Sequence, residues 1–131
     1  MIGRQGALCG NVFAVSGKLF ASEHAIVVTP RSKTDVRWLT HALHRMELNR
    51  YSESSAQPGL SVAKLLRMEL SVPPTSKEQV AIAAVLSDID VEIAALERRR
   101  DKIRAIKQGV MQQLLTGRVR LVKPQASEAP A

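Results

Sequence analysis

Two short segments of the chain carry side chains whose types suit contact with phosphate or with base edges. The first is the glycine-rich loop GRQG at residues 3–6, and the second is the stretch QPGLSVAK at residues 57–64. Glycines let a backbone approach a ligand closely, while Arg4 and Gln5 bring a cation and an amide. The other interpretation is that both segments are turns with solvated polar side chains, and that Ser61 only caps a short helix.

The sequence offers no recognisable catalytic or metal-binding constellation. Cys9, His24, His41 and His44 match no zinc-ligand spacing. His41 and His44 could share one face of a helix, but without further ligands we interpret them as exposed or packing histidines. Phosphate-loop, dinucleotide and nucleophile-elbow motifs do not occur. We therefore expect a protein that is not an enzyme and that binds neither a metal nor a cofactor.

Composition narrows the class of protein. The chain has 131 residues and a formal net charge of +7, with a sequence pI near 10.2, which suits a polyanion such as DNA or an anionic membrane surface. No stretch approaches the roughly 18 apolar residues that span a bilayer. The single Cys9 allows no intramolecular disulfide and fits an inert, small apolar side chain in a reducing compartment. We expect a cytoplasmic protein with no membrane partner.

One long helix is predicted between residues 75 and 117. Pro73 and Pro74 precede it, and the residues from Thr75 onward fit the capping box, in which a Ser or Thr and a later Glu or Gln satisfy free N–H groups. Gly117 stands where helices commonly end. About 40 residues at roughly 1.5 Å each predict a rod of about 60 Å.

Apolar residues recur in heptads along this predicted helix. Five sustained heptads favour a coiled coil, although Arg100 and Lys107 interrupt the pattern. A single amphipathic helix packed on its own domain would show such a stripe too. The residues of this apolar seam are Ile82, Leu86, Ile89, Ile93, Leu96, Ile103, Val110 and Leu114.

Charge is also segregated along the helix. An acidic half with Asp88 and Glu97 comes first, and a basic half from Arg98 to Lys107 follows. Part of this polarity complements the helix macrodipole. An antiparallel partner of the same polarity would place its basic half against this acidic half, whereas a parallel partner would align like charges. We therefore predict antiparallel pairing with another helix or with a second copy in a homodimer.

Short strands are predicted on both sides of the helical segments. Residues 11–15 and 18–20 read as a hairpin with a turn between them, and residues 25–29 as a third strand. Residues 69–72 and 118–122 are expected to add two more. Short apolar stretches bounded by turn residues or proline, such as the Ser16-Gly17 turn and Pro30, carry this prediction.

The remaining elements complete an α+β fold class. Helical spacing predicts a helix at residues 35–47 and a short helical turn near Lys64. We expect residues 1–72 to form a small partial domain and residues 75–117 to form the coiled-coil helix. Residues 118–131 then make up a C-terminal tail.

Four segments of the chain together match the pattern of one known family. They are GRQGALCGNV at residues 3–12, SAQPGLSVAKL at 55–65, VPPTSKEQVAIAAVLSDID at 72–90 and KQGVMQQLLTGRVRL at 107–121. With these segments the chain resembles the specificity subunit of type I restriction-modification systems, which chooses the DNA sequence for an associated methyltransferase and nuclease. The last two segments are quite specific, and the resemblance covers nearly the whole chain.

The resemblance implies an organisation for the chain. Residues 1–72 would be the distal part of a target recognition domain, and residues 75–117 the conserved helix that spaces two such domains. In a complete subunit two antiparallel helices join the domains and dock the methyltransferase subunits, and through the complex the restriction subunit. The chain resembles the C-terminal fragment of such a subunit.

The resemblance also implies which side chains contact double-stranded DNA. Arg4 or Lys64 would meet phosphate, and Gln5 or Gln57 a base edge, with Ser61 as a further candidate. The expected function is non-catalytic DNA recognition combined with scaffolding. The alternative is a structural coiled-coil dimerisation module, or a truncated remnant, that binds no DNA of its own.

Overall fold

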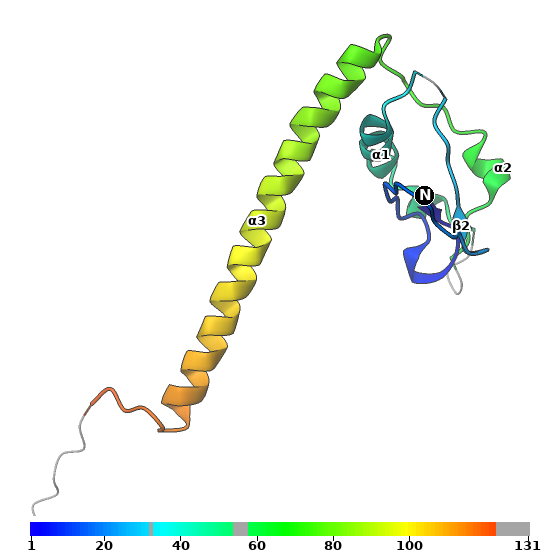
Figure 1. Cartoon of the computed structure of the whole chain (residues 1–131). Helices are drawn as coiled ribbons and strands as arrows, with labels where there is room; N and C mark the ends of the chain where they lie inside the picture. The colour runs from blue at the N-terminus through cyan, green and yellow to red at the C-terminus, as the bar shows by residue number, and fades with distance from the viewer. Residues whose placement is uncertain (32, 54–57, 123–131) are drawn as a thin grey trace, which may run out of the picture. The chain divides into compact units, whose positions relative to one another are not determined.

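The computed structural model describes residues 1–31, 33–53 and 58–122 (Figure 1). The chain divides into two compact units, Met1–Ile89 and Asp90–Ala131. The longest element, helix α3 (Ser76–Leu115), belongs partly to each of them. A small two-stranded sheet combined with helices confirms the predicted α+β fold class.

The sheet is built around the first residues of the chain. Strand β1 (Ile2–Gly3) pairs with β2 (Ala25–Ile26) in antiparallel fashion, with Ile2 opposite Ile26. On the other side of β1, Ile2 forms a bridge with Val12. Backbone pairing on both sides places the first strand inside the sheet rather than at its edge. The Ile2 side chain is 1% exposed because it packs in the apolar core.

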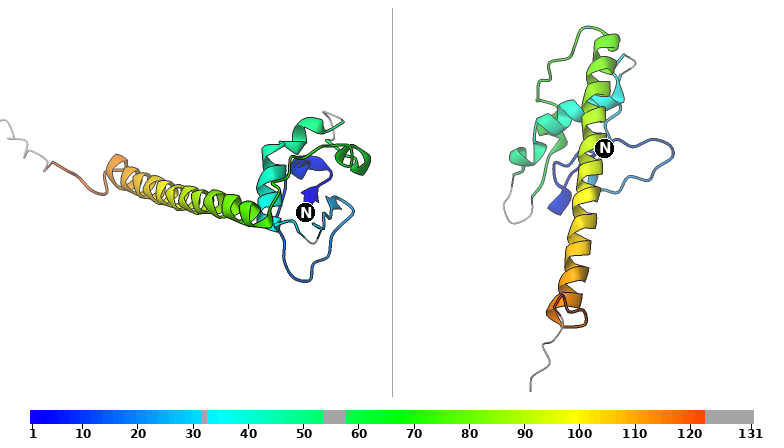
Figure 2. Two further views of the ribbon diagram at one scale, coloured as in Figure 1. Left: turned by 90° about the horizontal axis from the view of Figure 1, so that it is seen from above. Right: turned by 90° about the vertical axis from the view of Figure 1, so that its left-hand side faces the viewer.

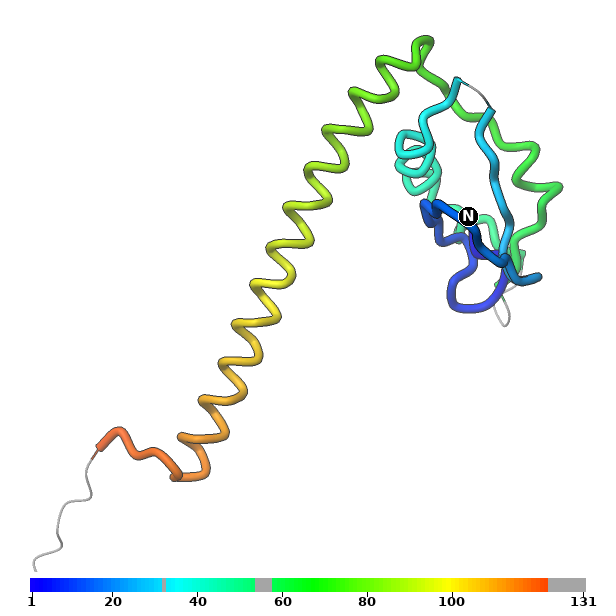
Figure 3. Tube along the Cα trace, in the orientation of Figure 1, coloured from blue at the N-terminus to red at the C-terminus, as the bar shows by residue number. Residues whose placement is uncertain are grey.

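The strand predictions are largely wrong. In the expected hairpin at residues 11–15 and 18–20 only Val12 pairs, and its partner is Ile2. Residues 13–20 are exposed, and the backbone trace there is an irregular loop (Figure 3). The strand expected at 25–29 is confirmed at its first two residues, whereas residues 69–72 and 118–122 form no strand. Alternating side chains favour an extended backbone, but a strand also needs a partner for its N–H and C=O groups.

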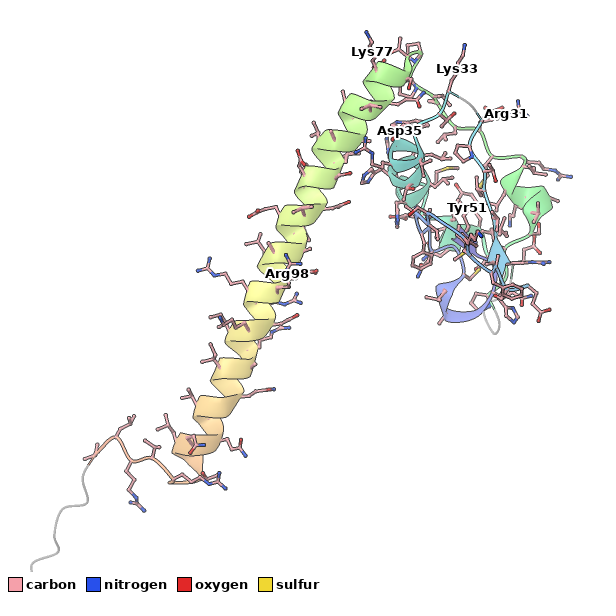
Figure 4. All side chains as sticks on the ribbon, viewed as in Figure 1. Arg31, Lys33, Asp35, Tyr51, Lys77 and Arg98 are labelled. Atoms are coloured by element: carbon pink, nitrogen blue, oxygen red, sulfur yellow. The ribbon has the colours of Figure 1, made fainter. Side chains whose placement is uncertain are left out.

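Helix α1 (Val36–Arg45) confirms the helix predicted from apolar spacing. Its start is fixed by Asp35, whose Oδ1 accepts hydrogen bonds from the N–H groups of Arg37 and Trp38 at 3.0 and 2.9 Å. These bonds satisfy donors that a helix leaves free at its first turn. Figure 4 labels Asp35 beside the start of this helix.

Three short helical segments complete the first unit. They are the 3₁₀ helices η1 (Gly6–Leu8) and η2 (Leu48–Tyr51), and the helix α2 (Val62–Leu65). Helix α2 confirms the predicted helical turn near Lys64. Each of these segments is too short to be stable alone, so packing must hold it.

Helix α3 confirms the long helix in both its start and its end. Thr75 Oγ1 accepts a hydrogen bond from Glu78 N–H at 3.2 Å, as the capping box predicts. At the other end Gly117 has a φ of 72°, and its N–H donates to Leu114 O at 3.2 Å. The ribbon of α3 is unbroken in both views of Figure 2.

The core of the first unit is small and apolar. Cys9 belongs to it, as expected for an inert thiol, and burial raises the pKa of that thiol above its ordinary value. The fully buried members are Ile2, Cys9, Val12, Leu48 and Leu60, with Ile26, Leu43, Met46, Leu65 and Met68 packed against them.

The first turns of α3 are tied to α1 by a buried amide. Gln79, only 4% exposed, accepts a hydrogen bond from Asp35 N–H at 2.9 Å and donates one to Pro73 O at 3.2 Å. Ala83 on the next turn is fully buried. These contacts lie within Met1–Ile89, so the beginning of α3 belongs to the same compact unit as the sheet.

Candidate nucleic-acid interface

The loop that carries Arg4 and Gln5 is fixed by its backbone. Arg4 N–H donates to His24 O at 2.8 Å, and Arg4 O accepts from Leu60 N–H at 2.9 Å. Because backbone groups make these bonds, both side chains of the loop remain exposed. A cation and an amide are therefore presented from a backbone that is held on two sides.

The same loop meets the beginning of the second predicted segment. Gly6 N–H donates to Pro58 O at 3.0 Å, and Gln5 forms a backbone bridge with Gly59. The two segments selected from sequence are thus adjacent in the fold, although more than fifty positions separate them. Gln57, the remaining amide candidate, lies outside the described residues.

Two glycines of this region are required by the close approach of backbone. A Cβ atom on Gly3 would lie 2.0 Å from Leu8 O, and one on Gly10 would lie 2.2 Å from Asn49 N. Gly10 also has a φ of 81°, a left-handed conformation that other residues rarely adopt. The glycines therefore shape the loop and seat it on η2.

Gln5 makes a side-chain hydrogen bond that the sequence did not suggest. Its Oε1 lies 2.8 Å from His24 Nδ1, and His24 Nε2 lies 3.6 Å from Glu23 Oε1. A cavity of about 520 Å³ borders the pair, with Met1, Leu8 and Phe13 among its lining residues. The antiparallel pairing of β1 with β2 brings residues 5 and 24 together.

Ser61 and Lys64 have local structural partners. Ser61 Oγ accepts a hydrogen bond from Lys64 N–H at 3.2 Å and so caps α2. The Lys64 ammonium donates to Tyr51 O at 2.8 Å, which leaves two of its three donors for other partners. Capping therefore accounts for the serine, whereas the lysine keeps the capacity to meet a phosphate.

The apolar seam of α3 is mostly accessible. Ile82 and Leu114 are partly buried, and the other six predicted seam residues are exposed, with Leu96 at 54% and Ile103 at 58%. Repeated exposure of large aliphatic side chains on a helix is typical of a surface that binds another protein segment.

Charged side chains on α3 follow the order expected from sequence, and two arginines of the basic half pair with Asp101. Arg100 Nε lies 2.9 Å from Asp101 Oδ1, and this carboxylate raises the pKa of the arginine. Arg104 Nη1 lies 4.0 Å from the same oxygen. The Arg98 side chain projects from the helix ribbon in Figure 4.

The described part of the chain contains neither a membrane-spanning helix nor a cluster of metal ligands. No helix of residues 1–31, 33–53 and 58–122 is long and apolar enough to span a bilayer. Within the same ranges no group of three or more His, Cys, Asp or Glu side chains is arranged to hold a metal ion.

His24 and Gln79 are among the polar residues whose roles sequence reasoning missed. His24 forms a hydrogen bond with Gln5, 19 positions earlier in the chain, and Gln79 accepts one from Asp35 N–H, 44 positions earlier. A pattern confined to one segment carries no signal for such pairs.

Together these features define a small α+β module that presents Arg4 and Gln5 on a fixed loop and continues into a long helix with an accessible apolar seam. A sequence model of the type I restriction modification DNA specificity domain matches residues 2–105, and the chain belongs to this family. This confirms the resemblance seen in the sequence, and it places the chain among subunits that are not catalytic.

A known relative supports the same assignment. The chain is 48% identical over 90 residues to the type I restriction enzyme EcoprrI specificity subunit of Escherichia coli. The aligned region covers 69% of this chain and 22% of the relative, so the chain spans about a fifth of that protein's length. No solved structure matches the chain.

Proposed function

We propose that this chain recognises double-stranded DNA and provides a spacer helix within a type I restriction-modification specificity subunit. Family membership and the net charge of +7 support this function. The observation that carries the proposal is the Arg4–Gln5 loop, which three backbone hydrogen bonds hold against two other segments. A loop that is already ordered loses little conformational entropy when it binds.

The two exposed side chains of the loop have different roles in this proposal. Arg4 contacts a phosphate and sets the position of the loop on the duplex, while the Gln5 amide contacts a base edge. Lys64 adds a second phosphate contact with its free donors. Ser61 mainly holds α2, and Gln57, outside the described residues, remains a candidate for contact with a base edge.

The helix has a separate role in the proposal. The seam from Ile82 to Leu114 pairs with a second helix in antiparallel orientation, either a spacer helix of the complete subunit or a second copy of this chain. The paired helices then dock methyltransferase subunits and, through the complex, the restriction subunit. This assembly would act on DNA in the cytoplasm.

Salt-dependent binding tests the DNA-recognition proposal. Affinity of the full chain for a fluorescently labelled duplex of mixed sequence is measured across a salt series, and it should fall steeply because phosphate contacts release counterions. Arg4→Gln should reduce the slope of log affinity against log salt by about 1. Lys18→Gln, which removes an exposed charge outside the loop, should leave the slope unchanged.

A different class of function is a coiled-coil dimerisation module without DNA binding. The accessible seam of α3 is the observation that favours it. Absence of duplex binding at low salt, together with self-association in sedimentation, would support this class and refute DNA recognition by the chain. If Arg4→Gln and Lys18→Gln give equal slopes of log affinity against log salt, Arg4 does not contact a phosphate of the duplex.

A further inference from the structure

The contact between Gln5 and His24 constrains how the Gln5 amide can meet a base. The atom of Gln5 that faces the ring is Oε1, which only accepts hydrogen bonds, so His24 Nδ1 must carry the proton. The other ring nitrogen faces the Glu23 carboxylate at 3.6 Å. The hydrogen bond through Nδ1 is therefore the contact that orients the imidazole toward Gln5.

The backbone around the pair supports a fixed register. Arg4 N–H donates to His24 O at 2.8 Å, and Gly3 lies opposite Ala25 in the sheet. These bonds place the two side chains on neighbouring strand ends, independently of the side-chain contact itself. Gln5, His24 and Glu23 are all exposed, so a base edge can reach them.

We propose that His24 is a positioning residue for sequence recognition, which holds the Gln5 amide so that it selects guanine over adenine at one base pair. This inference rests on the proposed DNA-binding function. A free glutamine recognises adenine with both amide atoms, its oxygen accepting from N6 and its nitrogen donating to N7. His24 occupies one acceptor position of Oε1 and fixes the plane of the amide.

The donors of the amide remain available. Within the described residues Gln5 Nε2 makes no hydrogen bond, so its two hydrogens can meet a partner outside the chain. Guanine presents two acceptors, O6 and N7, in the major groove, whereas adenine presents a donor and an acceptor. An amide that offers donors while its oxygen is held therefore matches guanine better.

Selection from a duplex library with a randomised window tests this inference. The full chain is compared with Gln5→Ala, His24→Ala and His24→Asn, since an asparagine amide can replace the Nδ1–H donor. We expect the wild type to prefer guanine at one position, and Gln5→Ala to lose that preference. His24→Ala should lower the guanine-over-adenine ratio there about tenfold while total affinity changes little, and His24→Asn should restore it.

The possible results distinguish a failure of the His24 role from a failure of the proposed DNA-binding function. If the wild type binds duplex but His24→Ala keeps its guanine preference, the role of His24 is refuted and the proposed function stands. The same holds if the wild type binds without any base preference. Loss of all binding in folded His24→Ala, not restored by His24→Asn, would make the histidine a DNA contact and refute a positioning role. If the wild type binds no duplex at low salt, both proposals fail.

Discussion

The buried Gln79 amide should stabilise the junction of α1 and α3 by a measurable amount. Truncation in Gln79→Ala leaves Asp35 N–H and Pro73 O without their present partner. An unsatisfied buried polar group costs about 1–3 kcal/mol, and both groups here are only partly buried. Taking the lower part of that range for each, we expect a loss of about 2–4 kcal/mol in the free energy of unfolding.

The assay uses the only tryptophan of the chain. Trp38 is 5% exposed on α1, where its N–H shares the cap of Asp35. Urea unfolding followed by its fluorescence therefore reports on the structure that Gln79 supports. With about 4–8 °C per kcal/mol for a domain of this size, a loss of about 2–4 kcal/mol should lower the Tm by roughly 10–30 °C.

A matched control separates the buried amide from a general effect of removing glutamine. Gln108→Ala changes the same side chain at an exposed site on α3 and should alter stability by less than about 0.5 kcal/mol. Equal stabilities for Gln79→Ala and Gln108→Ala would refute the reasoning. A change in the m-value, which is the dependence of the unfolding free energy on urea concentration, would instead indicate that the variant exposes a different amount of surface on unfolding.

Two further predictions concern the loop and the helix. Gly10→Ala places a Cβ 2.2 Å from Asn49 N at a φ of 81°, so urea unfolding should show a loss of at least about 2 kcal/mol; a wild-type midpoint would contradict this. Changing Asp88, Asp90 and Glu92 to Lys should weaken self-association in sedimentation velocity, because an antiparallel pair would then align basic halves. Preferred pairing of this variant with the wild type, and unchanged pairing with itself, would indicate parallel helices instead.

The sequence predicted the helices well because their signals are local. Asp35 caps α1 through residues two and three positions later, and Thr75 does the same for α3. Apolar spacing and Gly117 carried the rest. These capping and spacing signals involve residues within one or two helical turns of each other, so they can be recognised directly in the sequence.

The strands and the histidine partner could not be predicted in the same way. β1 has two residues and hence no period, and Ile2 pairs with residues 10 and 24 positions later. Residues 12–15 are all apolar, but Val12 pairs with Ile2 rather than with a hairpin strand. Gln5 was selected by its chemistry, whereas His24 became relevant only through that same long-range pairing.

The burial of Gln79 and Ala83 has a consequence for how order is distributed along α3. Its first turns are held by tertiary contacts, whereas the residues after Asp90 rely on intrinsic helix propensity and on local pairs such as Arg100 with Asp101. Amide hydrogens should therefore exchange slowly near Ala83 and progressively faster toward Gly117. A helix partner that covers the seam would slow the exchange of the later amides, so the order of that segment depends on partner concentration by mass action.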